Sequence, residues 1–288
     1  MSWTVTNDVQ NLLGKNLDRL ESPSLRLEKM LFMKRKQDNK ERQINAVVAC
    51  HNRHAVFPAV GFADIPDAAR FVMKLGGRLL VDHAGGILEN TGLALHPHFG
   101  CPYIPGSAVK GIARHHAWCK WHEAESESAE KQRAALRLAL TFGFPTGDSI
   151  VKKIERTRKQ DYLDEYLRAQ FPQFFGTDAP FATLAGNVCF LPAFPVVVQG
   201  KLPRLTKDIT TCHHRKYYKE EQQEKAYDNE QPNVLPFPAV EAGASFEFTV
   251  KPIRRFALVA SAFSDELPDF DAMAYAEECL REGLEEFG

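Results

Sequence analysis

Residues 103–116 constrain this chain more than any other segment, because they combine a tight turn with the start of a helix. Pro105-Gly106 favours the turn, and Ser107 is a residue type preferred at a helix N-cap. Counting onward, Ser107, Lys110 and Arg114 fall at i, i+3 and i+7, which places them on one face of the predicted helix. We expect the opposite face to be buried, because it is apolar: Val109, Ile112, Ala113 and Ala117.

The polar face of this helix has the chemistry of a phosphate site. The N-terminus of a helix offers free backbone N–H groups at Gly106 and Ser107, and Lys110 and Arg114 would add two cations beside them. Gly111 lies within the helix, where a residue without a side chain lets another backbone approach closely. The alternative is an ordinary amphipathic helix with basic residues on its solvent face, since Pro-Gly-Ser is also common turn chemistry.

The overall charge gives no general attraction to nucleic acid. The 288 residues include 36 Lys and Arg and 37 Asp and Glu, for a net charge of -1, and the hydrophobic content of 44% is ordinary for a globular protein. Any RNA contact must therefore come from a local patch and from backbone N–H groups. This balance argues against a free-standing RNA-binding protein and is compatible with a subunit of a larger assembly.

The cysteines and the N-terminus indicate a cytoplasmic protein. Six cysteines are widely scattered without a Cys-x-x-Cys pair, which favours reduced thiols over a disulfide framework. The first residues, Met-Ser-Trp-Thr, lack the basic region and apolar core of a signal peptide, and no apolar run approaches the length of a membrane span. We therefore expect no membrane partner.

Periodicity and turn residues predict a mixture of helices and strands. Helices are expected within residues 1–45 and at 64–75, 107–122, 134–140, 151–170 and 269–287. Strands are expected at residues 78–83, 91–95, 188–190, 196–198, 245–251 and 256–260, with loops at 142–148 and 206–218. The first two strands read as a hairpin that leads into the helix after Pro105, which is the opening of a ferredoxin-like unit.

The last predicted helix is acidic on its outer face. That face carries Glu277, Glu278, Glu282, Glu285 and Glu286. Carboxylates repel phosphate, so we expect this face to meet protein or solvent rather than RNA.

A second candidate RNA contact lies in the predicted loop at 206–218. The loop contains four cationic or imidazole side chains directly before Tyr217 and Tyr218: His213, His214, Arg215 and Lys216. Cations beside stacking rings suit single-stranded or splayed RNA. An irregular surface loop without RNA is the alternative.

Histidine also raises catalysis and metal binding as alternatives. His213 and His214 would be available to assist metal-independent RNA cleavage by acid–base chemistry, or to stack on bases instead. His115, Cys119 and His122 fall at i, i+4 and i+7 on the predicted helix, but they lack the tighter spacing of usual zinc motifs. We expect no catalytic residue, no metal and no cofactor.

Five sequence blocks in a fixed order carry a family resemblance. They comprise residues 78–81 with 89–93; 95–114, including Tyr-Ile-Pro-Gly-Ser-Ala-Val-Lys-Gly; 175–177 with 186–188 and 193–195; 208–214 with Tyr217-Tyr218; and 232–233 with 236–237 and 240–248. Together they resemble the RAMP superfamily of CRISPR proteins, in particular the head-end RAMP subunit of the type III-B (Cmr) effector complex. Pro192 departs from the family pattern, which often has Asp before Ala-Phe-Pro.

The resemblance implies an α+β fold with a ferredoxin-like (RRM-like) core. It implies an N-terminal helical region at residues 1–76 and a RAMP domain at 77–288 with a helical insertion at about 123–172. RAMP proteins usually continue after the last helix into a Gly-rich loop and a final strand, so we expect a Gly-rich tail beyond residue 288.

The function implied by the resemblance is that of a non-catalytic RNA-binding subunit. It would hold the crRNA 3′ region and the guide–target duplex in a type III-B effector complex, beside other RAMP subunits and a small helical subunit. Guides vary in sequence, so it would contact phosphate and sugar rather than bases. A metal-independent crRNA-processing endoribonuclease and a pure protein–protein adaptor remain the alternatives.

Overall fold

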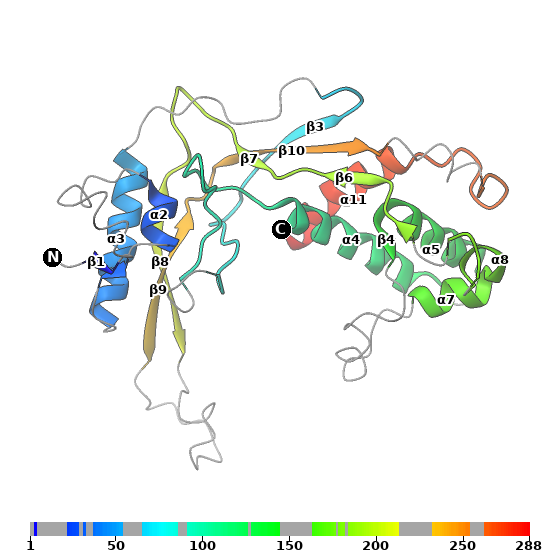
Figure 1. Cartoon of the computed structure of the whole chain (residues 1–288), viewed down its shortest axis with the longest axis horizontal. Coiled ribbons are helices and arrows are strands. Elements are labelled where there is room, and N and C mark those ends of the chain that lie inside the picture. The colour runs from blue at the N-terminus through cyan, green and yellow to red at the C-terminus, as the bar shows by residue number, and fades with distance from the viewer. Residues whose placement is uncertain are drawn as a thin grey trace, which may run out of the picture. The chain divides into compact units, whose positions relative to one another are not determined.

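The computed structural model (Figure 1) describes residues 3–4, 22–28, 31–32, 37–53, 65–85, 91–125, 128–144, 163–176, 178–181, 184–212, 232–253 and 262–288. The chain forms two compact units. The first comprises Met1–Gly61, Val72–Ile104 and Ala193–Glu247, and the second comprises Phe62–Phe71, Pro105–Pro192 and Phe248–Gly288.

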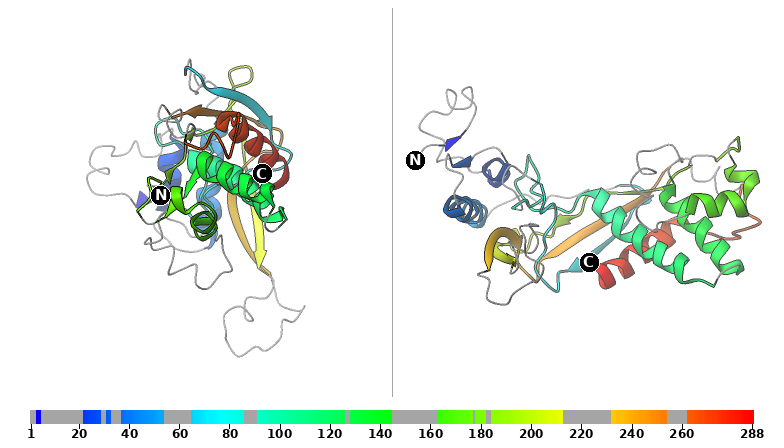
Figure 2. Two further views of the ribbon diagram at one scale, coloured as in Figure 1. Left: turned by 90° about the vertical axis from the view of Figure 1, so that its right-hand side faces the viewer. Right: turned by 90° about the horizontal axis from the view of Figure 1, so that it is seen from below.

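Three helices dominate the second unit: α4 (Gly106–Glu123), α5 (Ala129–Phe142) and α11 (Ala272–Phe287). Figure 2 shows α11 lying alongside α4. The two helices cross closely at Gly283, where an added Cβ would lie 3.0 Å from the carbonyl oxygen of Ile112. Two shorter helices, α7 (Leu163–Gln170) and α8 (Pro172–Phe175), complete the helical part.

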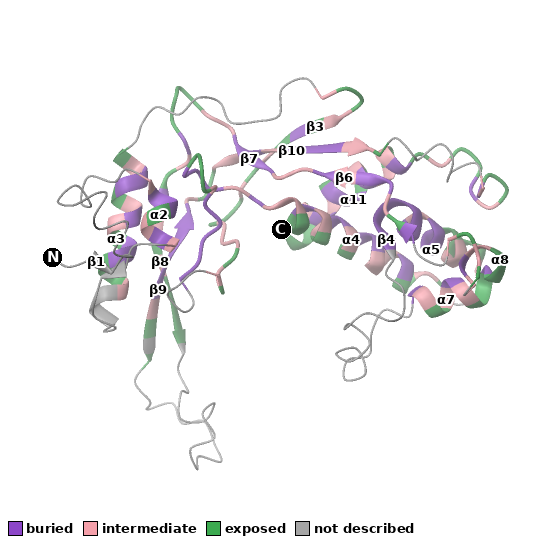
Figure 3. Cartoon of the chain, viewed as in Figure 1, coloured by how far each residue is buried: buried purple, intermediate pink, exposed green. Residues whose placement is uncertain are grey.

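The core of the second unit is aliphatic and aromatic. Most of α5 is buried, which Figure 3 shows in purple, and its inward side chains include the fully buried Leu136, Leu138 and Leu140. The short strands β4 (Gly143–Phe144) and β5 (Leu184–Ala185) pair antiparallel beside it. The buried Asn187 amide donates to the Leu140 carbonyl oxygen at 2.6 Å. These contacts anchor β6 (Val188–Phe190) to the end of α5.

A long antiparallel hairpin and a helix form much of the first unit. Strand β8 (Leu205–Cys212) pairs along its whole length with β9 (Asn233–Val240). Helix α3 (Gln37–Arg53) packs against this hairpin, and the Asn52 side chain exchanges two hydrogen bonds with the Leu205 backbone, at 2.8 and 2.9 Å. The remaining elements are α2 (Pro23–Glu28) and the paired strands β1 (Trp3–Thr4) and β2 (Leu31–Phe32).

The predicted hairpin at 78–95 is present as hydrogen-bonded extended chain rather than as regular strands. The amide of Ala94 donates to the Val81 carbonyl at 2.9 Å, and the amide of Gly92 donates to the His83 carbonyl at 3.0 Å. The chain then turns again, since Leu95 pairs with Pro102 across a tight turn. This second turn leads directly into Pro105 and α4.

Strands β3 (Ala69–Lys74), β10 (Ser245–Pro252) and β6 follow one another in an antiparallel sheet, with β7 (Phe194–Pro195) also paired to β10. The predicted helix at 64–75 is therefore wrong. Pairing in the sheet selects a strand there, and its buried Phe71 ring stacks on Phe248 with the centroids 5.6 Å apart.

Other predicted elements are confirmed, shifted or outside the described residues. The strands at 188–190 and 245–251 and the helices at 107–122, 134–140 and 269–287 are confirmed, with ends that differ by a few residues. The predicted strand at 196–198 is displaced to β7, and residues 206–212 form β8 instead of a loop because they pair with β9. The predicted strand at 256–260 lies outside the described residues, as do most of residues 1–21 and all of residues 145–162.

The fold is α+β, with helices and antiparallel sheet, as predicted. The ferredoxin-like arrangement of its core and the division at residues 76 and 77 stay predictions. Within the described ranges, no helix has both the length and the apolar character needed to cross a membrane.

Candidate nucleic-acid interface

The start of α4 differs from the prediction in one residue's role. The helix begins at Gly106, and the N-cap position is Pro105, whose carbonyl accepts from the amides of Ala108 and Val109 at 2.9 and 3.0 Å. Ser107 is therefore the second residue of the helix and not its N-cap. Its side chain is exposed, and within the described part of the chain its hydroxyl has no hydrogen-bond partner.

Gly106 is fixed by close packing within the second unit. A Cβ at this position would lie 2.5 Å from the Phe190 carbonyl oxygen and 3.3 Å from backbone atoms of Leu191 and Pro192. The glycine thus lets the chain after β6 pass against the first turn of α4. Gly111 is the opposite case, since it is exposed and no described atom lies within 4 Å of an added Cβ. The backbone approach expected there is not made by the described part of this chain.

Lys110 and Arg114 form a pair of neighbouring cations. Both side chains are half-buried on α4. Of the four residues expected to be buried on the opposite face, Val109, Ala113 and Ala117 are buried and Ile112 is half-buried. Burial lowers the pKa of the Lys110 ammonium, and the positive charge of Arg114 lowers it further. Among the described residues, Lys110 has no carboxylate partner. An anion placed here would relieve the repulsion between two cations.

The second candidate contact is not described. His213, His214, Arg215 and Lys216 lie outside the described residues, and the described hairpin ends at Cys212 and Asn233. Their RNA contact, and their catalytic alternative, stay predictions.

The acidic face of α11 is partly used inside the second unit. Lys120 of α4 bonds to Glu278 at 2.9 Å and to Glu282 at 2.6 Å. The buried His116 places its Nε2 atom 2.8 Å from Glu282 and its Nδ1 atom 3.0 Å from Glu286. Sequence reasoning missed this network. The available signal was the matching four-residue spacing on the two helices, with His116 and Lys120 on α4 and Glu278, Glu282 and Glu286 on α11.

Among the described residues, the histidine and cysteine side chains of α4 (His115, Cys119 and His122) are not arranged as a set of metal ligands. His115 and His122 are exposed, and the Nε2 atom of His115 lies 3.9 Å from the Cys119 sulfur. In the described part of the chain, no group of three or more His, Cys, Asp or Glu side chains is arranged to hold a metal ion.

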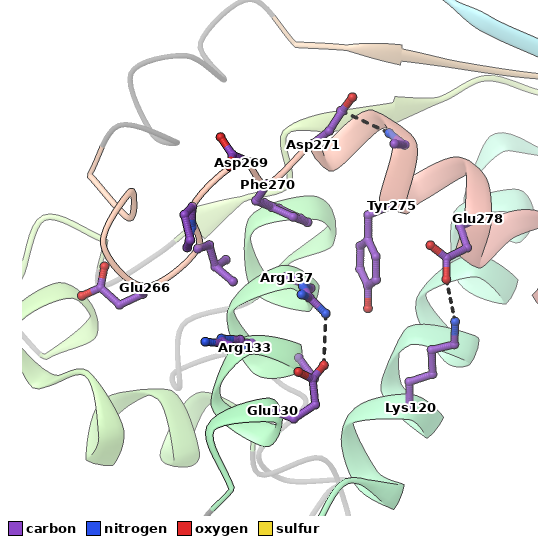
Figure 4. A pocket seen from close by; sticks show the side chains of 14 residues that line it. Lys120, Glu130, Arg133, Arg137, Glu266, Asp269, Phe270, Asp271, Tyr275 and Glu278 are labelled. Atoms are coloured by element: carbon purple, nitrogen blue, oxygen red, sulfur yellow. Dashed lines mark hydrogen bonds and ion pairs between the residues drawn. The ribbon is translucent and has the colours of Figure 1, made fainter.

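A cavity of about 670 Å³ lies between α4, α5, α11 and the segment before α11 (Figure 4). Its charged lining consists of Lys120, Arg133 and Arg137 and of Glu130, Glu266, Asp269, Asp271 and Glu278. Carboxylates outnumber cations, and ion pairs join Arg137 to Glu130 at 3.1 Å and Lys120 to Glu278 at 2.9 Å. The sequence did not predict this cavity, and its charge is unsuited to phosphate.

A sequence model of the RAMP superfamily matches residues 61–278, which include the candidate cations of α4 and most of the second unit. The chain belongs to the RAMP superfamily. The family expectation drawn from the five blocks is thus confirmed.

One curated RAMP relative is the CRISPR system Cmr subunit Cmr6 of Pyrococcus furiosus, which is 27% identical over 163 residues. That match covers 50% of this chain and 45% of the relative, so the chain matches less than half the length of the curated protein.

Two solved structures are also similar to this RAMP chain. The crystal structure of Cmr6 from Pyrococcus furiosus has a TM-score of 0.36 and 19% identity, covering 77% of this chain and 91% of that one. The cryo-EM structure of the type III-B Cmr-beta bound to cognate target RNA has a TM-score of 0.38 and 14% identity, covering 91% of this chain and 79% of that one.

Proposed function

We propose that this RAMP-superfamily chain is a non-catalytic RNA-binding subunit of a type III-B CRISPR effector complex. Its sequence similarity to a Cmr subunit supports the assembly. The observation that carries the RNA contact is the pair Lys110 and Arg114, two adjacent cations on one face of α4, of which Lys110 lacks a carboxylate partner among the described residues.

Phosphate is the group that this face of α4 is suited to bind. The amides of Gly106 and Ser107 lie in the first turn, where helix N–H groups have no acceptor within the helix. With Lys110 and Arg114 they offer directed donors and positive charge to one anion. None of these groups distinguishes one base from another, so the contact would hold guides of any sequence by their backbone.

In the complex, the chain would hold the crRNA 3′ region and the guide–target duplex. Its neighbours would be other RAMP subunits and the small helical subunit. The exposed, open position of Gly111 supports close approach by RNA backbone from outside the chain. The net charge of -1 supports a subunit that depends on its partners for affinity rather than a free RNA-binding protein.

The test is the double variant Lys110→Glu with Arg114→Glu in the assembled complex. We expect weaker retention of guide RNA, and a slope of log affinity against log salt that is smaller by roughly 1–2 units, because two phosphate contacts are lost. The matched control is Arg133→Glu with Lys201→Glu, which changes the net charge equally at two exposed positions elsewhere in the chain. Unchanged retention in the first variant would contradict the phosphate contact.

Two further measurements separate the alternatives. Cleavage of repeat RNA by the purified chain without metal, lost in His213→Ala or His214→Ala, would favour the endoribonuclease. RNA crosslinking in the assembled particle tests the adaptor, since an absence of adducts near Lys110 and Arg114 would support a chain that contacts only protein.

A further inference from the structure

Five aromatic and imidazole rings cluster in the first unit at the turn that precedes α4. His96 lies at the centre. Its ring stacks on Phe99 with the centroids 4.5 Å apart and the planes at 23°. The ring centroids of Tyr103 and Phe194 lie 5.4 and 5.6 Å from that of His96, and the centroid of His98 lies 5.8 Å from it. The function proposed above does not use this cluster.

The turn that carries these rings is closed by its own hydrogen bonds. The amide of Gly100 donates to the His96 carbonyl at 2.7 Å, and the amide of His96 donates to the Cys101 carbonyl at 2.8 Å. The amide of Phe99 also donates to the Nδ1 atom of His96, at 3.3 Å. The backbone and the central ring are therefore held in one arrangement.

Helix α2 braces the same turn. Gly100 has a φ of +65°, and a Cβ there would lie 2.9 Å from Cδ of Pro23. The hydroxyl of Ser24 donates to the Pro97 carbonyl at 3.3 Å. A turn fixed from inside and from one side loses little conformational freedom on binding, which favours a preformed contact surface.

Phe99 is exposed despite this rigidity. Its side chain is 42% exposed, whereas Phe194 beneath the cluster is only 7% exposed. His96 stacks on one face of the Phe99 ring, and Phe194 approaches the ring in a T-shaped arrangement with the centroids 6.4 Å apart. Burial and the neighbouring His98 lower the pKa of His96, and its Nδ1 atom accepts from the Phe99 amide.

We propose that the turn at residues 96–99 is a stacking platform for an unpaired RNA base, with the exposed Phe99 ring as the contact. This inference rests on the proposed RNA-binding function and adds a base contact to its phosphate contact. Aromatic and imidazole rings bind bases of any identity through their faces, so the platform would be compatible with guides of variable sequence.

The charge of the surrounding sequence favours RNA over a protein partner. Residues 91–122 contain no Asp or Glu, although the chain has 37 acidic residues, so the segment that carries the platform does not repel phosphate. A basic protein segment would be recognised by carboxylates, which this stretch does not supply.

The experiment measures binding of a short single-stranded RNA, and of the same RNA with abasic sites, to the assembled complex that contains this chain, by fluorescence anisotropy. Phe99→Ala should weaken binding of the intact RNA about 5- to 150-fold, since stacking of one base has that range of effect. The slope against salt should not change, because no charge is removed. Phe99→Trp should restore binding, and abasic RNA should bind wild type and Phe99→Ala equally.

Val198→Ala is the matched control, because Val198 is a 62% exposed apolar side chain elsewhere in the same unit. Equal affinity of wild type and Phe99→Ala, with binding still lost in the Lys110 and Arg114 double variant, would overturn the platform alone. Equal affinity of the complexes that carry the wild-type chain, Phe99→Ala and the Lys110 and Arg114 double variant would overturn both proposals. Loss of a co-purifying protein in Phe99→Ala, with RNA affinity unchanged, would assign the surface to a protein and also overturn the platform.

Discussion

The Nε2 atom of His116 lies 2.8 Å from the Oε2 atom of Glu282, which joins the middle of α4 to the last turns of α11. The His116 side chain is 4% exposed, and its other ring nitrogen faces Glu286. Both nitrogens face carboxylate oxygens, so the ring donates to both only when it carries two protons. The contact couples packing of the two helices to a charged hydrogen-bond network.

Replacing His116 should loosen the contact between α4 and α11. In His116→Gln, one side-chain amide replaces the two ring nitrogens that contact Glu282 and Glu286. We expect a loss of about 1 kcal/mol in unfolding free energy, the low end of the usual range, because both carboxylates can rehydrate. Urea unfolding and amide exchange in α11 measure the effect. His115→Gln, at an exposed neighbouring position, is the control and should change stability by less than about 0.5 kcal/mol. Equal protection of α11 in both variants would refute the coupling.

Stability in acid should depend on Glu282. A hydrogen bond from Lys120, followed by that from His116, lowers the pKa of Glu282 below its ordinary value of 4.5. The carboxylate therefore stabilises the fold at pH above 4.5 and loses this contribution as the pH falls through its lower folded-state pKa. Its exposure reduces the size of the effect. Urea midpoints of Glu282→Gln should be lower than wild type near neutral pH and should converge with it in acid. Glu285→Gln should show no such convergence.

Two glycines of α4 should respond in opposite directions to alanine. Gly106→Ala places a Cβ against the Phe190 carbonyl and should cost about 2 kcal/mol or more, because both atoms belong to rigid backbone. Gly111→Ala meets open space in an exposed helix and should stabilise the chain by about 0.5–1 kcal/mol. Thermal denaturation compares the two. If Gly111→Ala raises stability and still weakens RNA retention, RNA backbone approaches the helix at this position.

The N-cap of α11 should contribute measurably to stability. The Asp271 carboxylate accepts from the amides of Met273 and Ala274 at 2.8 and 3.2 Å. Asp271→Ala should cost about 1 kcal/mol, and Asp271→Ser should recover most of it, because serine also caps helices. Asp265→Ala, at a nearby exposed position, should be close to neutral. A fully stable Asp271→Ala chain would show that packing alone fixes the start of the helix.

Local signals predicted the elements that depend on local chemistry. Helix α11 was predictable because its apolar stripe and acidic face repeat at helical spacing. The shared face of Lys110 and Arg114 followed from spacing in the same way. The role of Ser107 did not, because Gly106 already adopts helical geometry and moves the cap to Pro105.

Features set by distant partners were not predictable from one sequence. Pro66 near the predicted first turn and Gly76-Gly77 after residue 75 resemble the ends of a helix, but pairing within the sheet makes β3 a strand. Residues 206–212 are polar and resemble a loop until they pair with β9. The contact between His116 and Glu282 joins positions that are 166 residues apart. The four-residue spacing on each helix shows that the two faces could pair, but it does not show that the two helices meet.

The tight fit of Gly106 against the Phe190 carbonyl also bears on how this family diverges. A relative that lacked the proposed RNA contact would still have to keep Gly106, because any side chain there would clash with the chain after β6. Packing places no such constraint on Lys110, so other residues could replace it. Persistence of the glycine alone would therefore reflect packing of the fold, and retention of the lysine with it would indicate selection for the proposed phosphate contact.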